Sequence, residues 1–166
     1  MFRTPHRVLA VLLLSAVPVL GQHNEVRADR VVVLKKDHVL TLYRNGRVLK
    51  QYRVALGWDP VGPKERQGDH KTPEGDYIID RHKANSQYHL ALHISYPNEE
   101  QVEVARKAGY SPGGDVFIHG LPAGYGRVGA AHRRFDWTDG CIAVTNQEIE
   151  EIWRLVPVGT PVEIRP

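Results

Sequence analysis

The sequence predicts a mainly β domain with two short helices. Most of the chain beyond residue 30 consists of short apolar segments separated by glycine, proline and charged residues, which is the pattern of strands joined by turns. Two stretches instead carry helix signals at both ends. Residues 22–166 contain no internal repeat and no interdomain linker. These 145 residues are enough for one domain with a sizeable core.

The first predicted element is a strand over Val31–Leu34, and a hairpin follows it. Asn45 and Gly46 form the favoured pair for a two-residue hairpin turn, in which both central residues need a positive φ. On the returning arm apolar residues recur at every second position, which is the period of a half-buried strand. These residues are Val48, Tyr52, Val54 and Leu56.

Four further strands are predicted downstream of a long loop. The loop, residues 58–75, is rich in glycine, proline and charge. It leads into strands over residues 76–80 and 88–94, and then into a short buried strand over Asp115–Ile118 that ends at His119. A turn and a final strand close the chain after residue 157.

The two helices are predicted from their caps. Glu99–Ala108 lies between Asn98, a good N-cap, and Gly109, a good C-terminal stop. In the second helix, Thr145 and Glu148 have capping-box spacing. Apolar residues then recur along one face at Ile149, Ile152, Trp153 and Val156.

The amino terminus predicts export. Arg3 and Arg7 precede an apolar run over Val8–Leu20, and the small residue Gly21 follows it. This order is typical of a secretory signal peptide, here residues 1–21, with residues 22–166 as the mature domain. The run of 13 residues is shorter than the roughly 20 needed to cross a bilayer, so no stable membrane span is expected. The predicted location is the periplasm or cell envelope.

Charge gives no sign of a nucleic-acid partner. The first 21 residues carry two arginines and no acid, so the remaining 20 basic residues nearly balance the 19 acidic ones. No lysine- and arginine-rich tract with interleaved aromatic residues occurs. His89 and His93 stand four apart in a predicted strand without an HExxH motif, so no metal site is expected. The histidines His70, His82 and His132 are interpreted as surface or loop residues.

Cys141 is the only cysteine, so it is either buried and inert or a reactive thiol. A cysteine nucleophile needs a nearby base, and His119 ends a predicted buried strand where a loop begins. Gly140 allows a substrate carbonyl to approach the backbone. The N–H groups of Gly140 and Cys141 could then form an oxyanion hole.

Four segments and one further residue together resemble the YkuD-type L,D-transpeptidase catalytic domain. "VFIHG" at 116–120 and "TDGC" at 138–141, with Asn146 beyond, resemble the family's His-Gly pair and its Ser/Thr-x-Gly-Cys element. "VALG" at 54–57 and "GDHKTPEGDYII" at 68–79 are similar to its upstream segments. The likeness covers nearly the whole mature chain and implies a β-sandwich-like, mostly antiparallel fold.

The resemblance also implies a chemistry. Cys141 would be the nucleophile, His119 its base, and Gly120 would orient the imidazole through its carbonyl. The substrates would be peptidoglycan stem peptides, attacked at the carbonyl of the diamino acid at position three, with release of terminal D-Ala. An amine would then accept the acyl group, and neither a metal nor an organic cofactor is required. Thioester formation should rise through a histidine-like pKa, and a rate flat from about pH 5 to 8 would argue against His119 as the base.

The sequence departs from the family pattern at three places. Ala143 stands where many members have arginine, Asp139 stands where histidine is frequent, and His119 and Cys141 are 22 residues apart, which is longer than usual. Arginines of the intervening stretch are candidates to replace the missing one. The predicted substrate-binding residues are Trp137, Thr138, Asp139, Arg127 and Arg134, with Arg133 as a further candidate arginine.

Two alternative functions stay open. The segment 136–146 looks closest to a subgroup that includes an amidase releasing a peptidoglycan-linked lipoprotein, so water could be the acceptor and a lipoprotein a partner. A hydrolase of the same family, such as an L,D-carboxypeptidase, shares the first acylation step. The other alternative is a non-catalytic peptidoglycan-binding domain that keeps the fold.

Overall fold

The computed structural model describes residues 26–166. The predicted signal peptide therefore lies outside the described residues. Within residues 26–166, no helix combines the length and the apolar character that crossing a bilayer would need.

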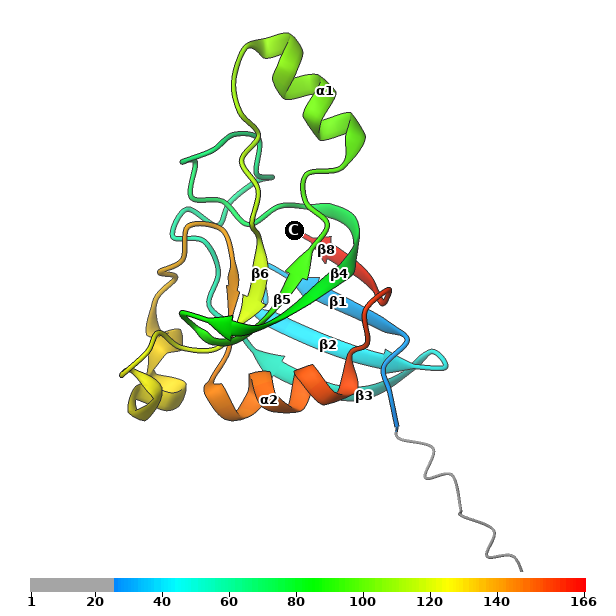
Figure 1. The fold of residues 1–166 in the computed structure, drawn as a ribbon, viewed down its shortest axis with the longest axis vertical. Coiled ribbons are helices and arrows are strands. Elements are labelled where there is room, and N and C mark those ends of the chain that lie inside the picture. Colours follow the sequence, from blue (N-terminus) through cyan, green and yellow to red (C-terminus); the bar gives the residue numbers. More distant parts are fainter. Residues whose placement is uncertain (1–25) are drawn as a thin grey trace, which may run out of the picture.

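Eight strands form one sheet in the order β3-β2-β1-β8-β4-β5-β6-β7 (Figure 1). Most neighbours are antiparallel, whereas the β1–β8 and β6–β7 pairs are parallel. The strands are β1 (Arg30–Leu34), β2 (Val39–Arg44), β3 (Arg47–Arg53), β4 (Gly75–Ser86), β5 (His89–Ile94), β6 (Phe117–His119), β7 (Ile142–Ala143) and β8 (Pro161–Arg165). The expected mainly β fold is confirmed.

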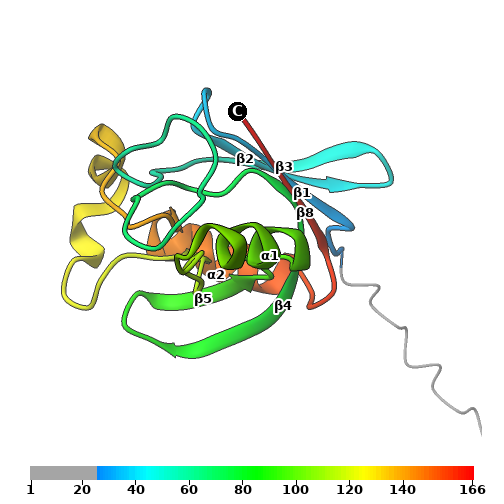
Figure 2. The same ribbon diagram turned by 90° about the horizontal axis from the view of Figure 1, so that it is seen from above.

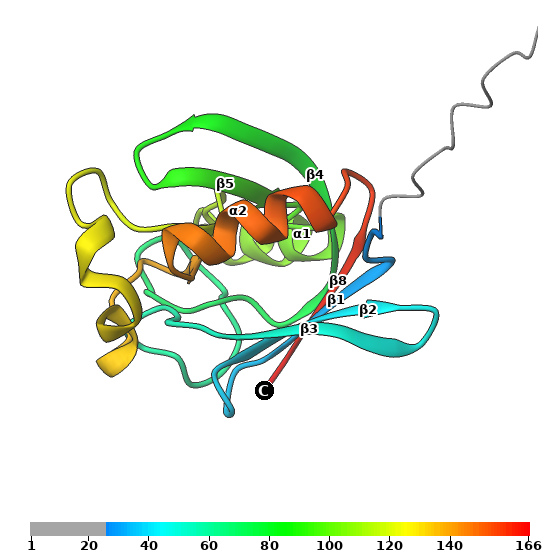
Figure 3. The same ribbon diagram turned by 90° about the horizontal axis from the view of Figure 1, so that it is seen from below.

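The long strand β4 curls the sheet. Its first residues, Gly75–Ile78, pair with β8, whereas Ile79 and the residues beyond it pair with β5. The register of the β4–β5 pair shifts between Ile79 and Arg81, as expected at a bulge that bends a strand. The β4–β5 hairpin therefore faces β1, β2 and β3 across the molecule instead of lying in their plane (Figures 2 and 3).

Helix α2 (Asn146–Leu155) fills the space between these two parts of the sheet (Figure 3). Ile149 and Ile152 are fully buried in the core, and Glu151 accepts a hydrogen bond from the hydroxyl of Tyr52 on β3. The predicted capping box is present, because the Thr145 hydroxyl accepts from the Glu148 N–H and the Glu148 carboxylate accepts from the Thr145 N–H. The second helix is thus confirmed with its cap.

Helix α1 (Glu99–Ala108) projects from the opposite end of the molecule (Figure 1). Asn98 caps its first turn and Gly109, at φ 77°, ends it, as predicted. A third short helix, η1 (Gly126–Arg134), lies where the sequence indicated only a loop. This 3₁₀ segment is kinked at Gly129 and has no side-chain cap, so it lacks the signals that mark an α-helix.

The hairpin turn is confirmed, since Asn45 and Gly46 have φ values of 51° and 73°. The alternation on the returning arm holds at Tyr52 but not at Val48, which is 59% exposed. A bulge between Leu42 and Tyr43 shifts the pairing register and turns Val48 outward.

Two strand boundaries and two histidines also differ from expectation. Strand β4 runs on to Ser86, and β6 begins only at Phe117. His132, expected to be a surface or loop residue, is buried within η1. His82 is partly buried, stacks on Trp153 at 4.3 Å between ring centroids, and its Nε2 lies 2.9 Å from the Val156 carbonyl oxygen.

Replacing Thr145 by alanine should lower the free energy of unfolding by about 1 kcal/mol, because the first turn of α2 would lose its side-chain acceptor. Urea denaturation measures the change. The control is Gln147→Ala in the same turn, where an exposed side chain should change stability by less than about 0.5 kcal/mol. Equal effects of the two substitutions would contradict the capping role.

Candidate active site

A cleft of about 400 Å³ opens between the β4–β5 hairpin, strand β6 and the turn before β7. It is lined by Lys83, Ser86, Gln87, Tyr88, Ala91, Asp115, Phe117, His119, Trp137, Thr138, Asp139 and Cys141. The two residues singled out for chemistry, His119 and Cys141, therefore lie on one cleft. They come from neighbouring parallel strands, at the end of β6 and just before β7.

His119 is held in one orientation and one tautomer. Its Nδ1 lies 2.7 Å from the Gly120 carbonyl oxygen. A carbonyl can only accept, so Nδ1 carries the proton and Nε2 keeps a free lone pair. Burial lowers the pKa of His119 to about 4, although the Gly120 carbonyl opposes this shift. The imidazole is therefore neutral and can accept a proton at pH 7.

Cys141 sits in a polar backbone notch. The Phe117 N–H donates to its Sγ over 3.4 Å, and the Asp115 carbonyl oxygen lies 3.7 Å from Sγ. Burial raises the pKa of the Cys141 thiol to about 11, and the Phe117 N–H counteracts part of the rise. At neutral pH the resting pair is thus a thiol and a neutral imidazole, not a thiolate–imidazolium ion pair.

Gly120 leaves no room for a side chain. A Cβ there would stand 2.8 Å from Asn146 Oδ1 and 3.0 Å from both Ile149 Cγ2 and the Tyr88 carbonyl oxygen. The same Asn146 oxygen accepts from the Leu121 N–H at 2.8 Å. These contacts fix the peptide whose carbonyl orients His119.

The turn that carries Cys141 is closed by Thr138. The Thr138 hydroxyl accepts from the Gly140 N–H at 3.1 Å and donates to the Cys141 carbonyl at 2.7 Å. Gly140 has φ 128°, and its absent Cβ would lie 2.5 Å from the Lys71 carbonyl oxygen. The Gly140 N–H, predicted to serve an oxyanion, therefore already donates to the Thr138 hydroxyl in this conformation. The Thr138 hydroxyl does not accept a hydrogen bond from the Cys141 N–H.

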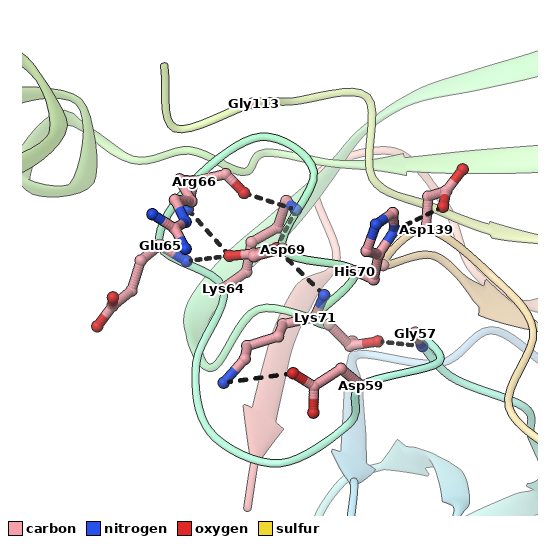
Figure 4. A network of polar contacts seen from close by, with 12 residues as sticks. Gly57, Asp59, Lys64, Glu65, Arg66, Asp69, His70, Lys71, Gly113 and Asp139 are labelled. Carbon is pink, nitrogen blue, oxygen red and sulfur yellow. Dashed lines mark hydrogen bonds and ion pairs between the residues drawn. The ribbon is translucent and has the colours of Figure 1, made fainter. Parts of the chain in front are cut away.

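The loop between β3 and β4 supports this turn from behind (Figure 4). Asp69 accepts hydrogen bonds from the Lys64 ammonium and from the backbone N–H groups of Glu65, Arg66 and Lys71. Burial alone would raise the pKa of Asp69, but these hydrogen bonds outweigh it and lower the pKa to about 2. The buried pair of Lys64 and Asp69 therefore gives the loop a fixed shape.

His70 joins the loop to the turn. Its Nδ1 lies 2.8 Å from an oxygen of Asp139 (Figure 4). Its ring also stacks on Trp58, with 4.5 Å between the ring centroids. His70 lies in a loop, as interpreted from the sequence, and it also contacts the residue two positions before Cys141. The Asp139 side chain itself is 90% exposed and lines the cleft.

The predicted substrate-binding residues separate into two groups. Trp137 and Asp139 line the cleft, and Thr138 lines it with its hydroxyl engaged in the turn. Arg127 and Arg134 do not line it, so the two arginines expected at the site lie elsewhere. Arg134 lines a separate hollow beside His38 and Phe135.

Neither Arg133 nor the residue at position 143 supplies the missing arginine side chain to the cleft. Arg133 pairs with Glu148 of the α2 capping box. Ala143 is fully buried and exchanges two backbone hydrogen bonds with Ala55. It pairs with His119, so its methyl group lies on the same face of the sheet as the imidazole and supplies no charge there.

The sequence did not indicate three residues that lie at or next to the site. Tyr88 stacks on His119 at 4.4 Å between ring centroids, His132 accepts from the Trp137 indole N–H at 3.3 Å, and Lys83 lies on the cleft wall. None of them belongs to a local motif. Their positions follow from strand register and from the path of η1, which no spacing in the sequence reveals.

A histidine that stays neutral above about pH 4 and a lone cysteine on one cleft define a candidate cysteine-dependent site on a curled β sheet. Residues 28–164 match the family model described as the L,D-transpeptidase catalytic domain, YkuD. The chain belongs to this family, as the motifs in its sequence indicated.

Two curated relatives carry the name "Putative L,D-transpeptidase". YafK of Escherichia coli (strain K12) is 33% identical over 151 residues, which cover 86% of this chain and 54% of YafK. YqjB of Bacillus subtilis (strain 168) is 27% identical over 154 residues, covering 92% of this chain and 80% of YqjB. The chain thus spans about half the length of YafK.

Solved structures share the fold. The helical cell shape determining protein Pgp2 from Campylobacter jejuni has a TM-score of 0.61 and 26% identity, covering 87% of this chain and 52% of Pgp2. An L,D-transpeptidase from Mycobacterium smegmatis has a TM-score of 0.55 at 16% identity, covering 84% of this chain and 59% of that one. The second likeness concerns the fold alone.

Gly140→Ala should destabilise the protein by about 3 kcal/mol or more, because the new Cβ would collide with the Lys71 carbonyl oxygen. The control is Gly159→Ala, where φ is also positive, at 91°, but no heavy atom lies within 4 Å of the new Cβ. That variant should lose only about 1–2 kcal/mol, the cost of the left-handed backbone. Chemical denaturation compares them, and equal losses would contradict the close approach.

Acidification should destabilise the fold before carboxylates titrate. In the folded chain the pKa values of His119 and His132 are lowered from 6.5 to about 4. Between pH 6.5 and 4 these two histidines are therefore protonated in the unfolded chain but neutral in the folded chain. Stability is therefore full above about pH 6.5 and falls as the pH drops towards 4. For His119 the expected loss at pH 5 is about 2 kcal/mol.

Urea denaturation at pH 7 and pH 5 tests this linkage. His119→Gln and His132→Gln should each reduce the difference in stability between the two pH values. Thr145→Ala lowers stability without removing a titrating group and should keep the full difference. An unchanged difference in both histidine variants would contradict the neutral, buried state of these side chains.

Proposed function

We propose that this chain is an exported cysteine acyltransferase that acts on peptidoglycan stem peptides through a Cys141 thioester. One observation carries the proposal: the Cys141 thiol and a neutral His119, with its tautomer set by the Gly120 carbonyl, line the same cleft. Membership of the L,D-transpeptidase catalytic domain family supports it. Pgp2, which shares the fold, is a cell shape determining protein, and this agrees with a role at the cell wall.

In the first step, His119 Nε2 takes the thiol proton as Sγ attacks the carbonyl carbon of the diamino acid at position three. The carbonyl oxygen becomes an oxyanion, and the Cys141 N–H is the donor of the turn that can meet it. The C–N bond to terminal D-Ala then breaks, and the amine leaves with the proton from His119. The product is a thioester on Cys141.

In the second step, an amine of a neighbouring stem loses a proton to His119 and attacks the thioester. Collapse of the second oxyanion releases the thiolate, which recovers the proton. Transfer to water by the same route gives hydrolysis. Asp139, exposed at the cleft, is a carboxylate positioned to attract an ammonium acceptor.

The low pKa of His119 changes the expected pH dependence of acylation. Because this pKa is about 4, the base is already neutral throughout the range from about pH 5 to 8. A flat rate in this range therefore no longer argues against His119, and the base-dependent fall belongs near pH 4. The raised thiol pKa means that proton transfer must accompany attack, which makes His119 more important for the rate.

A non-catalytic wall-binding domain is a weaker interpretation of the same geometry. Binding alone requires neither a notch in which the Phe117 N–H points at Sγ nor an imidazole with a fixed tautomer. Both features hold a reactive group in a fixed geometry, which catalysis requires and simple binding does not.

Incubation of the mature protein with purified sacculi and with a carbapenem, followed by intact mass measurement, tests the proposal. The expected result is a covalent adduct that disappears in Cys141→Ala and forms at least about 100-fold more slowly in His119→Ala. Arg134→Ala, outside the cleft, is the matched control and should acylate normally. A wild-type protein that forms no adduct and alters no muropeptide would overturn the proposal.

The muropeptide products identify the acceptor. New crosslinked dimers indicate an amine acceptor and hence transpeptidation. Free tripeptides indicate L,D-carboxypeptidase activity, and released lipoprotein fragments indicate the amidase reaction.

A further inference from the structure

The cleft holds one strongly basic side chain. Among the described residues that line it, Lys83 is the only lysine or arginine. We propose that Lys83 binds a free carboxylate of the donor stem peptide and so selects the donor. This inference rests on the proposed function and adds the substrate group that the enzyme would recognise.

Strand register places Lys83 on the same face as His119. Lys83 on β4 pairs with Ala91 on β5, and Ala91 pairs with His119 on β6. Directly paired residues point to the same side of a sheet, so the three form a row along one wall of the cleft. The two strand spacings separate the Cα atoms of Lys83 and His119 by about 10 Å. Ala91 between them is small and leaves that space open.

The ammonium group stays close to the cysteine side of the cleft. Lys83 Nζ lies 5.5 Å from the centroid of the Phe117 ring, and the backbone N–H of Phe117 contacts Cys141 Sγ. A cation over an aromatic face is held loosely enough to turn towards a stronger partner. Phe117 therefore contacts both the ammonium group and the thiol, which places the two groups at the same part of the cleft.

Lys83 has no acidic partner within residues 26–166. The ring of Phe117 contacts the Lys83 ammonium, whereas two less exposed cations have acidic partners. Lys64 pairs with Asp69 and Arg133 pairs with Glu148. An unpaired ammonium at a binding cleft is free to make a charge-assisted hydrogen bond to an anion.

The charges around the cleft give a substrate carboxylate one favourable position. Asp115 and Asp139 also line the cleft, and both carboxylates repel an anion. Ala143, where the family pattern usually has arginine, is buried and supplies no charge. The anion therefore settles at Lys83. The ammonium group of lysine is a point charge and lacks the planar, bidentate donor geometry of arginine, so it can bind a carboxylate in several orientations.

Two carboxylates of the donor share this chemistry. One is the terminal carboxylate of D-Ala in the leaving group. The other is the free carboxylate at the side-chain end of the diamino acid, where the diamino acid carries one. Amidating each group separately distinguishes the two sources.

Binding to inactive protein tests the inference without requiring turnover. In a Cys141→Ala background, calorimetry with a synthetic stem tetrapeptide should show affinity about tenfold weaker when Lys83→Met is added, and nearly restored by Lys83→Arg. The matched control is Arg81→Met, which removes a charge from the same strand outside the cleft. It should leave affinity unchanged, and thermal denaturation should show both variants equally folded.

The amidated peptides identify the partner group. The tetrapeptide whose amide replaces the carboxylate bound by Lys83 should bind with equal affinity to the Lys83→Met variant and to the protein that keeps Lys83. The other amidated peptide should keep the tenfold difference. Equal affinity of Lys83→Met and Arg81→Met for the unmodified tetrapeptide, or a difference that persists with both amides, would overturn the inference.

Acylation kinetics separate this inference from the proposed function. In otherwise wild-type protein, Lys83→Met should raise KM about tenfold and leave kcat within about twofold, because the carboxylate contact forms in the ground state. Absence of any thioester in the wild type overturns the proposed function, while the calorimetric result still decides the role of Lys83. A normal thioester with an unchanged KM in Lys83→Met overturns only the inference.

Discussion

Two close backbone approaches, at Gly120 and at Gly140, are the constraint on which the site depends. At Gly120 the chain passes against Asn146 and Ile149 of α2, and at Gly140 it passes against the Lys71 carbonyl. A side chain at Gly120 would push the end of β6 away from α2, and one at Gly140 would push the cysteine turn away from the loop between β3 and β4. The pairing of β6 with β7 places His119 and Cys141 on neighbouring strands, and the two glycines let α2 and the loop pack against them.

The electrostatic state of the pair follows from that closeness. Burial removes water from both side chains, so it disfavours the imidazolium and the thiolate alike. The Phe117 N–H and the Gly120 carbonyl are the largest opposing influences, and each acts on the group it contacts. The resting pair of Cys141 and His119 is therefore uncharged, and in the proposed mechanism charge develops on it when a substrate arrives.

The cleft beyond the pair is electrostatically uneven. Asp115 and Asp139 stand with the cysteine turn, whereas Lys83 stands two strands away on the hairpin wall. Asp139 is tied to His70, and His70 belongs to a loop whose shape is set by the buried pair of Lys64 and Asp69. One wall of the cleft is thus supported by a rigid loop, and the other is a hairpin that carries an unpaired cation. The proposed binding and the proposed chemistry thus fall to different parts of the fold.

The sequence by itself determined the mainly β class, the Asn45-Gly46 turn and both capped helices. It also singled out Cys141 and His119, the cysteine and histidine that line the cleft. These depend on interactions between residues close in the chain, or on a family motif that survives as a string. Tertiary structure alone decided the outward turn of Val48, the burial of His132, the capture of the Gly140 N–H by Thr138 and the absence of Arg127 and Arg134 from the cleft. It also placed Lys83 in line with His119. The physical reason is that bulges, strand register and the curl at β4 set which faces meet, and these arise from packing between segments tens of residues apart.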